Sequence, residues 1–503
     1  MRSQRLALLL ATLLVLSLIV TAGLGLQLRE LAALRQRVEN FEAERAQQRA
    51  QYEETIRQLK QQADDIDAEL SKTQSTLREL QRNFDQVRRE RDELQTQRNE
   101  LEQRNKQLEQ LIRNLQSMNR INEQVVGLRG LAPKNRVPRD VLTRNEYRQR
   151  LIAAMETDFP AEVERRERAK LVALDMIDPD LDLRSAIIED LAMFVLGFYD
   201  PSTKELYVIS DRETMGVEDR ITYAHEYTHF LQDEAFDLAA LQDSARSADE
   251  SLAIRALIEG DASLSMHFWA EEHLTDIDRI NYALEQLDRL ADLFGSLSFS
   301  GADTSIESIG QFPYTYGTRF VNLLYLQGGW RNVDRAYSRP PRSTAQILHP
   351  ELYFNNVNPV PVALPDLQAA LGPGWEVVDS DVLGELFLRV YLEYEVELYT
   401  AIAAAYGWRG DRYAVLEGPD GARALAIRVI LSNEAEAAQL FSTYTIYAEE
   451  KGGAPTATYT ATRRAWDLSD RQIYLSQAGR EVLILHAPDS ATLSALRGAF
   501  PDF

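Results

Sequence analysis

The chain has 503 residues, a formal charge of −23 at pH 7 and no cysteine. One hydrophobic core rarely serves a chain of this length, so we expect two or more structural units. The lack of cysteine excludes a disulfide scaffold, a Cys-ligated zinc module, an iron–sulfur cluster and a cysteine nucleophile. The acidity argues against nucleic acid as a partner, because phosphate binding needs a basic surface.

The first 26 residues carry the pattern of a membrane anchor. Arg2 and Arg5 precede an uncharged, largely apolar stretch over residues 6–26. A helix of about 20 residues spans the hydrocarbon core of a bilayer. We therefore predict a transmembrane signal anchor over residues 1–26, in a single-pass cell-membrane protein whose catalytic domain is extracytoplasmic. Cleavage after Ala22 is the alternative.

A heptad pattern follows over residues 27–125. Between residues 59 and 115 the apolar positions alternate four and three apart, over roughly eight heptads. This spacing predicts a coiled coil that forms a homo-oligomer, and Asn105 at a core position favours a defined register. A single solvated helix is the alternative. Residues 126–140 contain Gly and Pro, which is typical of a linker.

Beyond the linker the patterns predict an α+β fold in two parts. We place a mostly helical catalytic domain at residues 141–355 and a separate α+β domain at residues 356–503. The predicted elements of the first part are helices at 145–155, 161–176, 221–236 and 250–270 and strands at 193–199 and 205–210. Those of the second are helices at 383–405, 433–447 and 490–499 and strands at 413–417, 424–431, 472–475 and 482–485.

Residues 225–229 read His-Glu-Tyr-Thr-His inside one predicted helix. Residues four apart share a helical face, so His225 and His229 can bind one metal ion. Glu226 is then placed to take a proton from a water molecule and to return it to a leaving amine. The pattern therefore predicts a metal site with a general acid/base, and two incidental histidines on a surface helix are the alternative.

A third protein ligand is needed, and a later predicted helix offers Glu259. Gly260 and Ala262 beside it would let that helix approach its neighbour closely. Asp261 and Glu250 are the alternative ligands.

Residues 225–229, followed by the Glu-Gly-Asp-Ala segment at 259–262, resemble the gluzincin metallopeptidases. This resemblance implies zinc bound by His225, His229 and Glu259, with Glu226 as the general acid/base, and a zincin-like fold that hydrolyses peptide or protein substrates. The hairpin at residues 198–210 resembles the edge-strand region on which zincins hold extended substrates.

Chemistry of this type usually needs a Tyr or His that donates a hydrogen bond to the oxyanion. Tyr314, Tyr316 and His349 are candidates, and we predict Tyr316 and His349 as catalytic residues beside Glu226. Packing roles for these three side chains are the alternative. Asp233 is a candidate acceptor that would orient a ligand histidine.

The sequence thus favours a membrane-anchored, zinc-dependent peptidase. Two other classes of protein stay open: a catalytically inactive zincin-fold scaffold, and a coiled-coil structural or interaction protein of the cell envelope. The presence of Glu226 favours an enzyme over the inactive scaffold.

Overall fold

The computed structural model describes residues 10–12, 55–58, 61–62, 65–66, 69, 72, 87–284 and 304–503. The chain divides into two compact units. One comprises Met1–Ile112 and His273–Gln286, and the other comprises Arg113–Glu272 and Leu287–Phe503. The second unit contains every predicted site residue. The predicted boundary at residue 355 stays a prediction.

The elements alternate between helices and short strands in the first part of the chain. They are α2 (Val87–Arg129), β1 (Arg139–Leu142), α3 (Arg144–Asp158), α4 (Ala161–Ala173), α5 (Leu183–Phe194), β2 (Gly197–Asp200), β3 (Glu205–Ile209), α6 (Val217–Phe236), α7 (Leu238–Asp243), α8 (Ala248–His273), α10 (Thr304–Gly328), α11 (Trp330–Ser338), α12 (Thr344–Leu348) and α13 (Pro350–Phe354).

Most strands lie in the last part of the chain. The elements there are α14 (Leu367–Leu371), β4 (Glu376–Asp379), α15 (Gly384–Glu393), α16 (Leu398–Ala405), β5 (Trp408–Glu417), η2 (Pro419–Gly421), β6 (Arg423–Leu431), α17 (Glu434–Gly452), β7 (Ala457–Thr460), β8 (Arg463–Asp467), β9 (Gln472–Ala478), β10 (Glu481–Ala487) and α18 (Ser490–Gly498).

The smaller sheet has three strands in the order β1-β3-β2. β1 pairs with β3 in parallel, and β2 pairs with β3 antiparallel. Leu206 and Val208 of the central strand β3 are fully buried, and α6 packs against both β2 and β3. This packing places the edge strand β2 next to the helix that carries residues 225–229.

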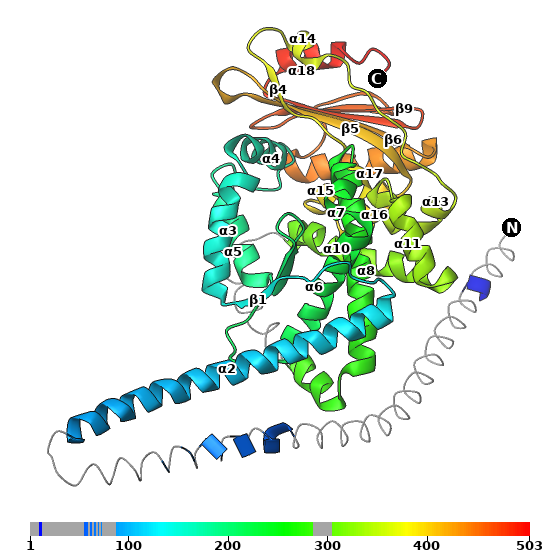
Figure 1. The fold of residues 1–503 in the computed structure, drawn as a ribbon. Helices are drawn as coiled ribbons and strands as arrows, with labels where there is room; N and C mark the ends of the chain where they lie inside the picture. The colour runs from blue at the N-terminus through cyan, green and yellow to red at the C-terminus, as the bar shows by residue number, and fades with distance from the viewer. Residues whose placement is uncertain are drawn as a thin grey trace. The chain divides into compact units, whose positions relative to one another are not determined.

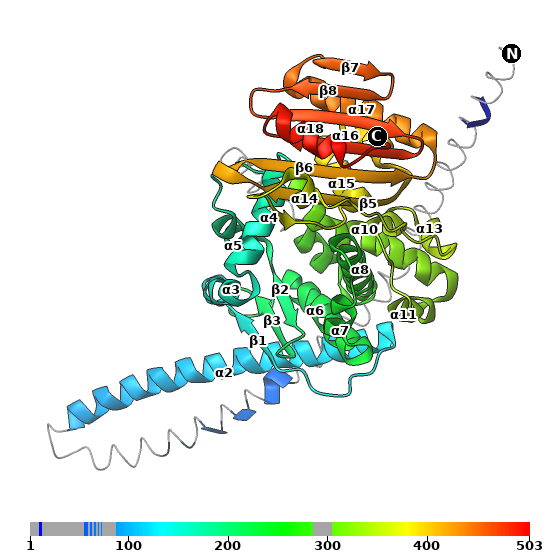
Figure 2. The same ribbon diagram turned by 90° about the horizontal axis from the view of Figure 1, so that it is seen from above.

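The larger sheet has seven antiparallel strands in the order β4-β5-β6-β10-β9-β8-β7 (Figures 1 and 2). α17 covers one face, and α14 and α18 cover the other (Figure 1). Side chains alternate between the faces along a strand. In β10, Val482 and Ile484 join the core on the α17 side, and Leu483 and Leu485 join the smaller core on the α18 side.

The larger core joins this sheet to the helices that carry the candidate site. It includes residues of the sheet and of α8, α10, α15 and α17, among them Ile427, Leu257, Phe320, Tyr391 and Tyr444. Because these helices share one tightly packed core, α8 and α10 are held in fixed positions.

The C-terminal turns of α2 are anchored in the second unit. Arg129 is fully buried and forms a bidentate ion pair with Asp261 of α8 (2.7 and 2.9 Å). Arg129 also bonds Asp334 and lies over the Trp330 ring, 4.5 Å from its centroid. Earlier on the same helix, Asn122 is hydrogen-bonded to the Tyr223 hydroxyl of α6 (2.8 Å). α2 therefore contacts both helices that contain the predicted metal ligands.

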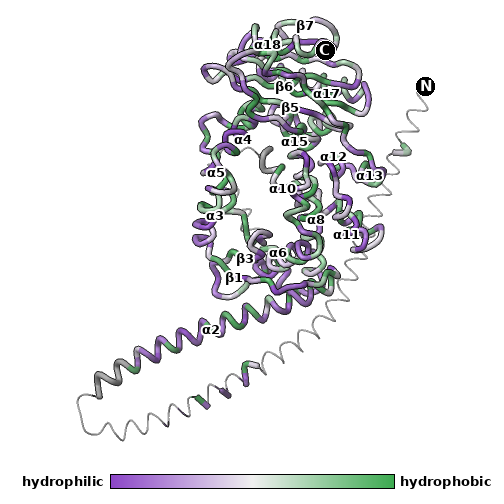
Figure 3. The backbone as a smooth tube through the Cα atoms, turned by 45° about the horizontal axis from the view of Figure 1, so that its top comes forward, coloured by the Kyte–Doolittle hydropathy of each residue, from purple (hydrophilic) through white to green (hydrophobic). Residues whose placement is uncertain are grey.

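The structure corrects the prediction of an N-terminal transmembrane helix, and with it the single-pass membrane location. Within the residues that the structure describes, no helix combines the length and the apolar character needed to cross a bilayer. In α8, Glu259 and Asp261 lie near the centre of the helix, and hydrophilic residues recur along α2 (Figure 3). The predicted span at residues 6–26 itself lies outside the described residues, except for residues 10–12.

Only part of the predicted coiled coil is described. Most of residues 27–86 lie outside the described residues, whereas α2 covers residues 87–125 and continues to Arg129. The helix therefore includes Gly127, which we expected in the linker. The predicted self-association stays a prediction.

Two predicted elements differ from those observed. α5 continues to Phe194, and β2 begins at Gly197, so the strand predicted from residue 193 is shorter. The helix predicted over residues 383–405 is two helices, α15 and α16.

Candidate metal centre

Helix α6 presents two imidazoles to the same point. The helix starts at Val217, where Asp219 accepts a hydrogen bond from the Gly216 amide (2.7 Å) and so satisfies a free donor of the first turn. His225 and His229 lie one turn apart, and their Nε2 atoms are 3.1 Å apart. Both side chains are buried.

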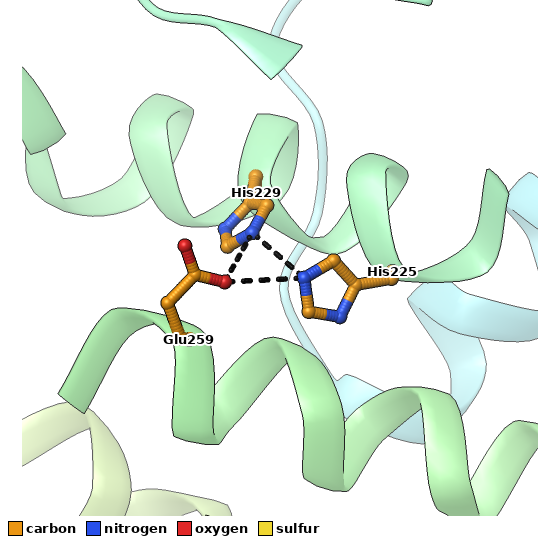
Figure 4. Close-up of side chains that lie close together, drawn as sticks. All are labelled: His225, His229 and Glu259. Atoms are coloured by element: carbon orange, nitrogen blue, oxygen red, sulfur yellow. Dashed lines mark hydrogen bonds and ion pairs between the residues drawn. The ribbon is translucent and has the colours of Figure 1, made fainter. Parts of the chain in front are cut away.

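Helix α8 supplies the carboxylate that completes the group. The Oε2 atom of Glu259 lies 3.2 Å from Nε2 of His225 and 3.2 Å from Nε2 of His229 (Figure 4). Within the described part of the chain, these three residues are the group of His, Asp and Glu side chains whose ligand atoms lie within 4.8 Å of one another. The group could therefore hold a metal ion.

The donor set and its spacing fit a tetrahedral divalent ion. Zinc takes His nitrogen and carboxylate oxygen at about 2.0–2.1 Å, so neighbouring ligand atoms lie about 3.3–3.4 Å apart. The three observed separations are 3.1, 3.2 and 3.2 Å. Three protein ligands leave one position open, which is typical of catalytic rather than structural sites.

Gln232 orients one of the two imidazoles. Nδ1 of His229 lies 2.8 Å from Oε1 of Gln232, and the Gln232 amide donates to the Ile258 carbonyl (3.0 Å). When Nδ1–H donates to Gln232, the lone pair of Nε2 faces Glu259. Gln232 thus has the orienting position for which Asp233 was a candidate. Asp233 instead accepts from Tyr199 and Lys204.

Glu259 is held in its charged form. Burial opposes the charge, but the imidazoles of His229 and His225 outweigh it and hold the pKa of the Glu259 carboxyl well below its ordinary value. An anionic oxygen is a stronger ligand for a divalent cation than a neutral one.

Glu226 is buried beside the three ligands and against the edge strand β2. Burial raises the pKa of its carboxyl, while His225, His229 and the nearby Tyr199 backbone of β2 act in the opposite direction. A Cβ added at Gly197 of β2 would lie 3.1 Å from Cγ of Glu226. The carboxyl therefore lies directly beside the outer edge of the smaller sheet.

Tyr314 of α10 also reaches this centre. Its ring centroid lies 6.1 Å from that of His225, and Arg255 lies near its hydroxyl. Burial, followed by the negative charge of Glu259, raises the pKa of Tyr314, so the phenol keeps its proton. It can therefore act as a hydrogen-bond donor.

A pair of glycines allows α10 to come this close to α8. A Cβ at Gly260 would collide with the Gly317 carbonyl group, and a Cβ at Gly317 would collide with the Ala256 carbonyl oxygen. We expected Gly260 to permit contact with the helix of residues 225–229, but its close contact is with α10. Tyr314 lies one turn before Gly317 and is brought near Glu259 by this crossing.

The structure does not bring Tyr316 or His349 to the metal ligands. The Tyr316 hydroxyl accepts from Arg389 (3.3 Å), since residues two apart face opposite sides of a helix and Tyr314 faces the ligands. Nε2 of His349 lies 2.6 Å from Oε1 of Glu385, and its ring meets Tyr406 edge-on.

The alternative third ligands have other partners. Asp261 pairs with Arg129 and accepts from the Tyr337 hydroxyl (2.8 Å). Glu250 pairs with Arg246 and Arg342.

Sequence reasoning missed Gln232 and Arg255. Gln232 lies three residues after His229, and Arg255 lies four residues before Glu259. Both spacings put a side chain on the same helical face as the ligand, and this signal could have found them.

Residues 374–497 match the family described as Domain of unknown function (DUF8575). This range contains all seven strands of the larger sheet but none of the residues of the metal centre. No curated protein matches the chain. A crystal structure from Chloroflexus aurantiacus, described as a candidate hydrolase with a novel fold, is similar at 20% identity and a TM-score of 0.33. The match covers 48% of this chain and 88% of that one, and at this level it carries no argument about activity.

Proposed function

We propose that this protein is a zinc-dependent hydrolase that cleaves peptide bonds. The observation that carries the proposal is the convergence of two imidazole nitrogens and one carboxylate oxygen beside the buried carboxyl of Glu226. His225, His229 and Glu259 would hold the ion. Zinc, when bound, supplies a Lewis acid that polarises a carbonyl and lowers the pKa of water.

The protein's own groups would move the proton and stabilise the developing charge. Glu226 takes the proton of the attacking water and passes it to the amine nitrogen as the C–N bond breaks. Tyr314 donates its hydroxyl to the carbonyl oxygen as that oxygen gains negative charge. Gln232 keeps His229 in one orientation throughout.

The edge strand β2 would hold the substrate. β2 is the outer strand of the smaller sheet, and Gly197 and Tyr199 of β2 lie close to Glu226. An extended peptide that adds to this edge by backbone hydrogen bonds would lie next to Glu226. Backbone pairing of this kind suits a peptide substrate better than a small ester or sugar.

A zinc analysis of the full-length protein tests the metal site. We expect about one zinc per chain, as three ligands are available. His225→Ala should lose this zinc, whereas the control His267→Ala, at an exposed position of α8, should keep it. Retention of zinc by His225→Ala would contradict the metal site.

Cleavage of a mixed peptide library tests the reaction. Glu226→Gln should keep zinc but lose about 10²–10⁴-fold in rate, because an amide cannot accept the proton of water. The control Glu272→Gln, at an exposed position, should cleave like the wild type. A zinc-loaded wild type that cleaves no peptide would instead favour the inactive scaffold.

A further inference from the structure

A guanidinium group lies at the candidate metal centre with unused donors. Arg255 is on α8, one helical turn before Glu259, and its side chain is 55% exposed. Its Nε lies 3.8 Å from Oε1 of Glu259, which is longer than a hydrogen bond. In Figure 4 the dashed lines from the two imidazoles meet the other oxygen of Glu259, Oε2.

Arg255 also lies near the Tyr314 hydroxyl, so its guanidinium is close to both a metal ligand and the proposed oxyanion donor. A guanidinium has five N–H donors in a planar fork that matches a carboxylate. Because more than half of the side chain is exposed, donors remain available to a bound molecule.

The position of Arg255 favours an anion once a divalent cation is bound. Oε1 of Glu259 is the carboxylate oxygen near Arg255, 3.8 Å from its Nε. A divalent cation held by His225, His229 and Glu259 would take over the charge of this carboxylate. Arg255 would then lack a full counter-charge at a position open to solvent.

We infer that Arg255 binds a carboxylate of the substrate, so that the enzyme prefers peptides with an acidic group next to the scissile bond. This inference rests on the proposed peptidase function. The carboxylate can come from an Asp or Glu side chain or from the C-terminus of a short peptide. The two sources share the same bidentate pairing with a guanidinium.

The test compares matched peptides on the zinc-loaded full-length protein. One pair of peptides differs by Glu or Gln beside the scissile bond, and a second pair has a free or an amidated C-terminus one residue beyond it. We expect the wild type to prefer the charged member of at least one pair by about tenfold or more in kcat/KM, as for a charge-assisted hydrogen bond. The pair that shows the preference identifies the source of the carboxylate.

Variants of Arg255 then test whether this residue causes the preference for the charged peptide. Arg255→Gln also removes the positive charge near Tyr314 and should slow the cleavage of all peptides, so the readout is the ratio of kcat/KM within a pair. That ratio should fall towards one in Arg255→Gln and survive in part in Arg255→Lys, which keeps the charge. The control Arg335→Gln, on α11, should keep the full ratio. An unchanged ratio in Arg255→Gln, or no preference in the wild type, would overturn the inference.

A binding measurement separates this inference from the proposed reaction. The same labelled peptides are titrated into zinc-loaded Glu226→Gln and into Glu226→Gln/Arg255→Gln. We expect the charged peptide to bind about tenfold more weakly to the double variant, with little change for its neutral partner. If no peptide is cleaved by the wild type, the proposed reaction fails, and this binding ratio alone decides for or against Arg255.

Discussion

Tyr314 is positioned by its neighbours rather than by a bond to any metal ligand. Its ring lies beside His225, and Arg255 lies near its hydroxyl. Since a guanidinium can only donate, Arg255 does not take up the hydroxyl proton of Tyr314. Tyr314 can therefore donate this proton to a group bound beside the three ligands.

We expect Tyr314→Phe to lower kcat/KM by about 10²-fold, which is typical for loss of one oxyanion donor. Zinc content should not change, because Tyr314 is not one of the three ligands. The measurement is peptide cleavage on matched zinc-loaded samples. Tyr316→Phe is the control, since its hydroxyl bonds Arg389. Equal losses of kcat/KM in the two variants would show that the Tyr314 hydroxyl does not act as the oxyanion donor.

At this scale the sequence predicts local relations better than distant ones. Helical spacing alone brings His225 and His229 together, and the need for a third ligand on a later helix points to Glu259 even without the resemblance to gluzincins. The choice between Tyr314 and Tyr316 could not be made in the same way. It depends on which face of α10 turns towards α8, and this is set by the crossing at Gly260.

The helix α2 acts as a brace behind both ligand helices. Asn122 bonds Tyr223, two residues before His225, and Arg129 pairs with Asp261, two residues after Glu259. Residues two apart face opposite sides of a helix, so these contacts lie on the sides of α6 and α8 that face away from the ligands. The spacing between the two helices is therefore supported from behind.

We expect Arg129→Met to lower the free energy of unfolding by about 3–5 kcal/mol, because it leaves Asp261 charged and buried without its main partner. Zinc affinity should fall with it. Denaturant unfolding and zinc titration measure the two effects. The double variant Arg129→Met/Asp261→Asn should recover part of the stability, as the unpaired charge is gone. A single variant as stable as the wild type would show that α2 is not a brace.

Long helices with clear periodicity were predicted well, and short polar strands were not. α6 and α8 lie within a few residues of their predicted positions. β7 was missed because its residues are mostly exposed and carry no apolar alternation. The break between α15 and α16 was missed too, since both helices are apolar enough to read as one.

At the scale of the whole molecule, the carboxyl side chains of Asp249, Glu385 and Asp411 are buried in a protein of net charge −23. Asp249 at the start of α8 is buried, and burial raises its pKa to about 8, with Asp411 and Glu385 adding to the shift. Thr344 donates to one oxygen of Asp249, and the other oxygen has no hydrogen-bond partner in the described structure. The folded protein thus binds a proton here that the unfolded chain releases.

This predicts that stability falls as the pH rises. With the pKa of Asp249 raised above its ordinary value near 4, the folded state holds more protons than the unfolded state between about pH 4 and pH 8, so unfolding becomes easier across that window. Asp249→Asn should flatten this slope. Melting temperatures between about pH 5 and pH 8 test it, with the exposed Asp243→Asn as the control. If Asp249→Asn does not change how the melting temperature varies with pH, other groups cause the pH dependence.

The distance between α10 and α8 beside the candidate metal centre depends on the two glycines, Gly260 and Gly317, that lie in contact there. One methyl group at either position would push α10 off α8 and carry the Tyr314 hydroxyl outward, while His225, His229 and Glu259 stay on their own two helices. Metal binding and the position of the Tyr314 hydroxyl can therefore change independently in this fold. Substitutions at Gly260 or Gly317 could change the size of the substrate group that fits beside Tyr314 while the three metal ligands stay the same.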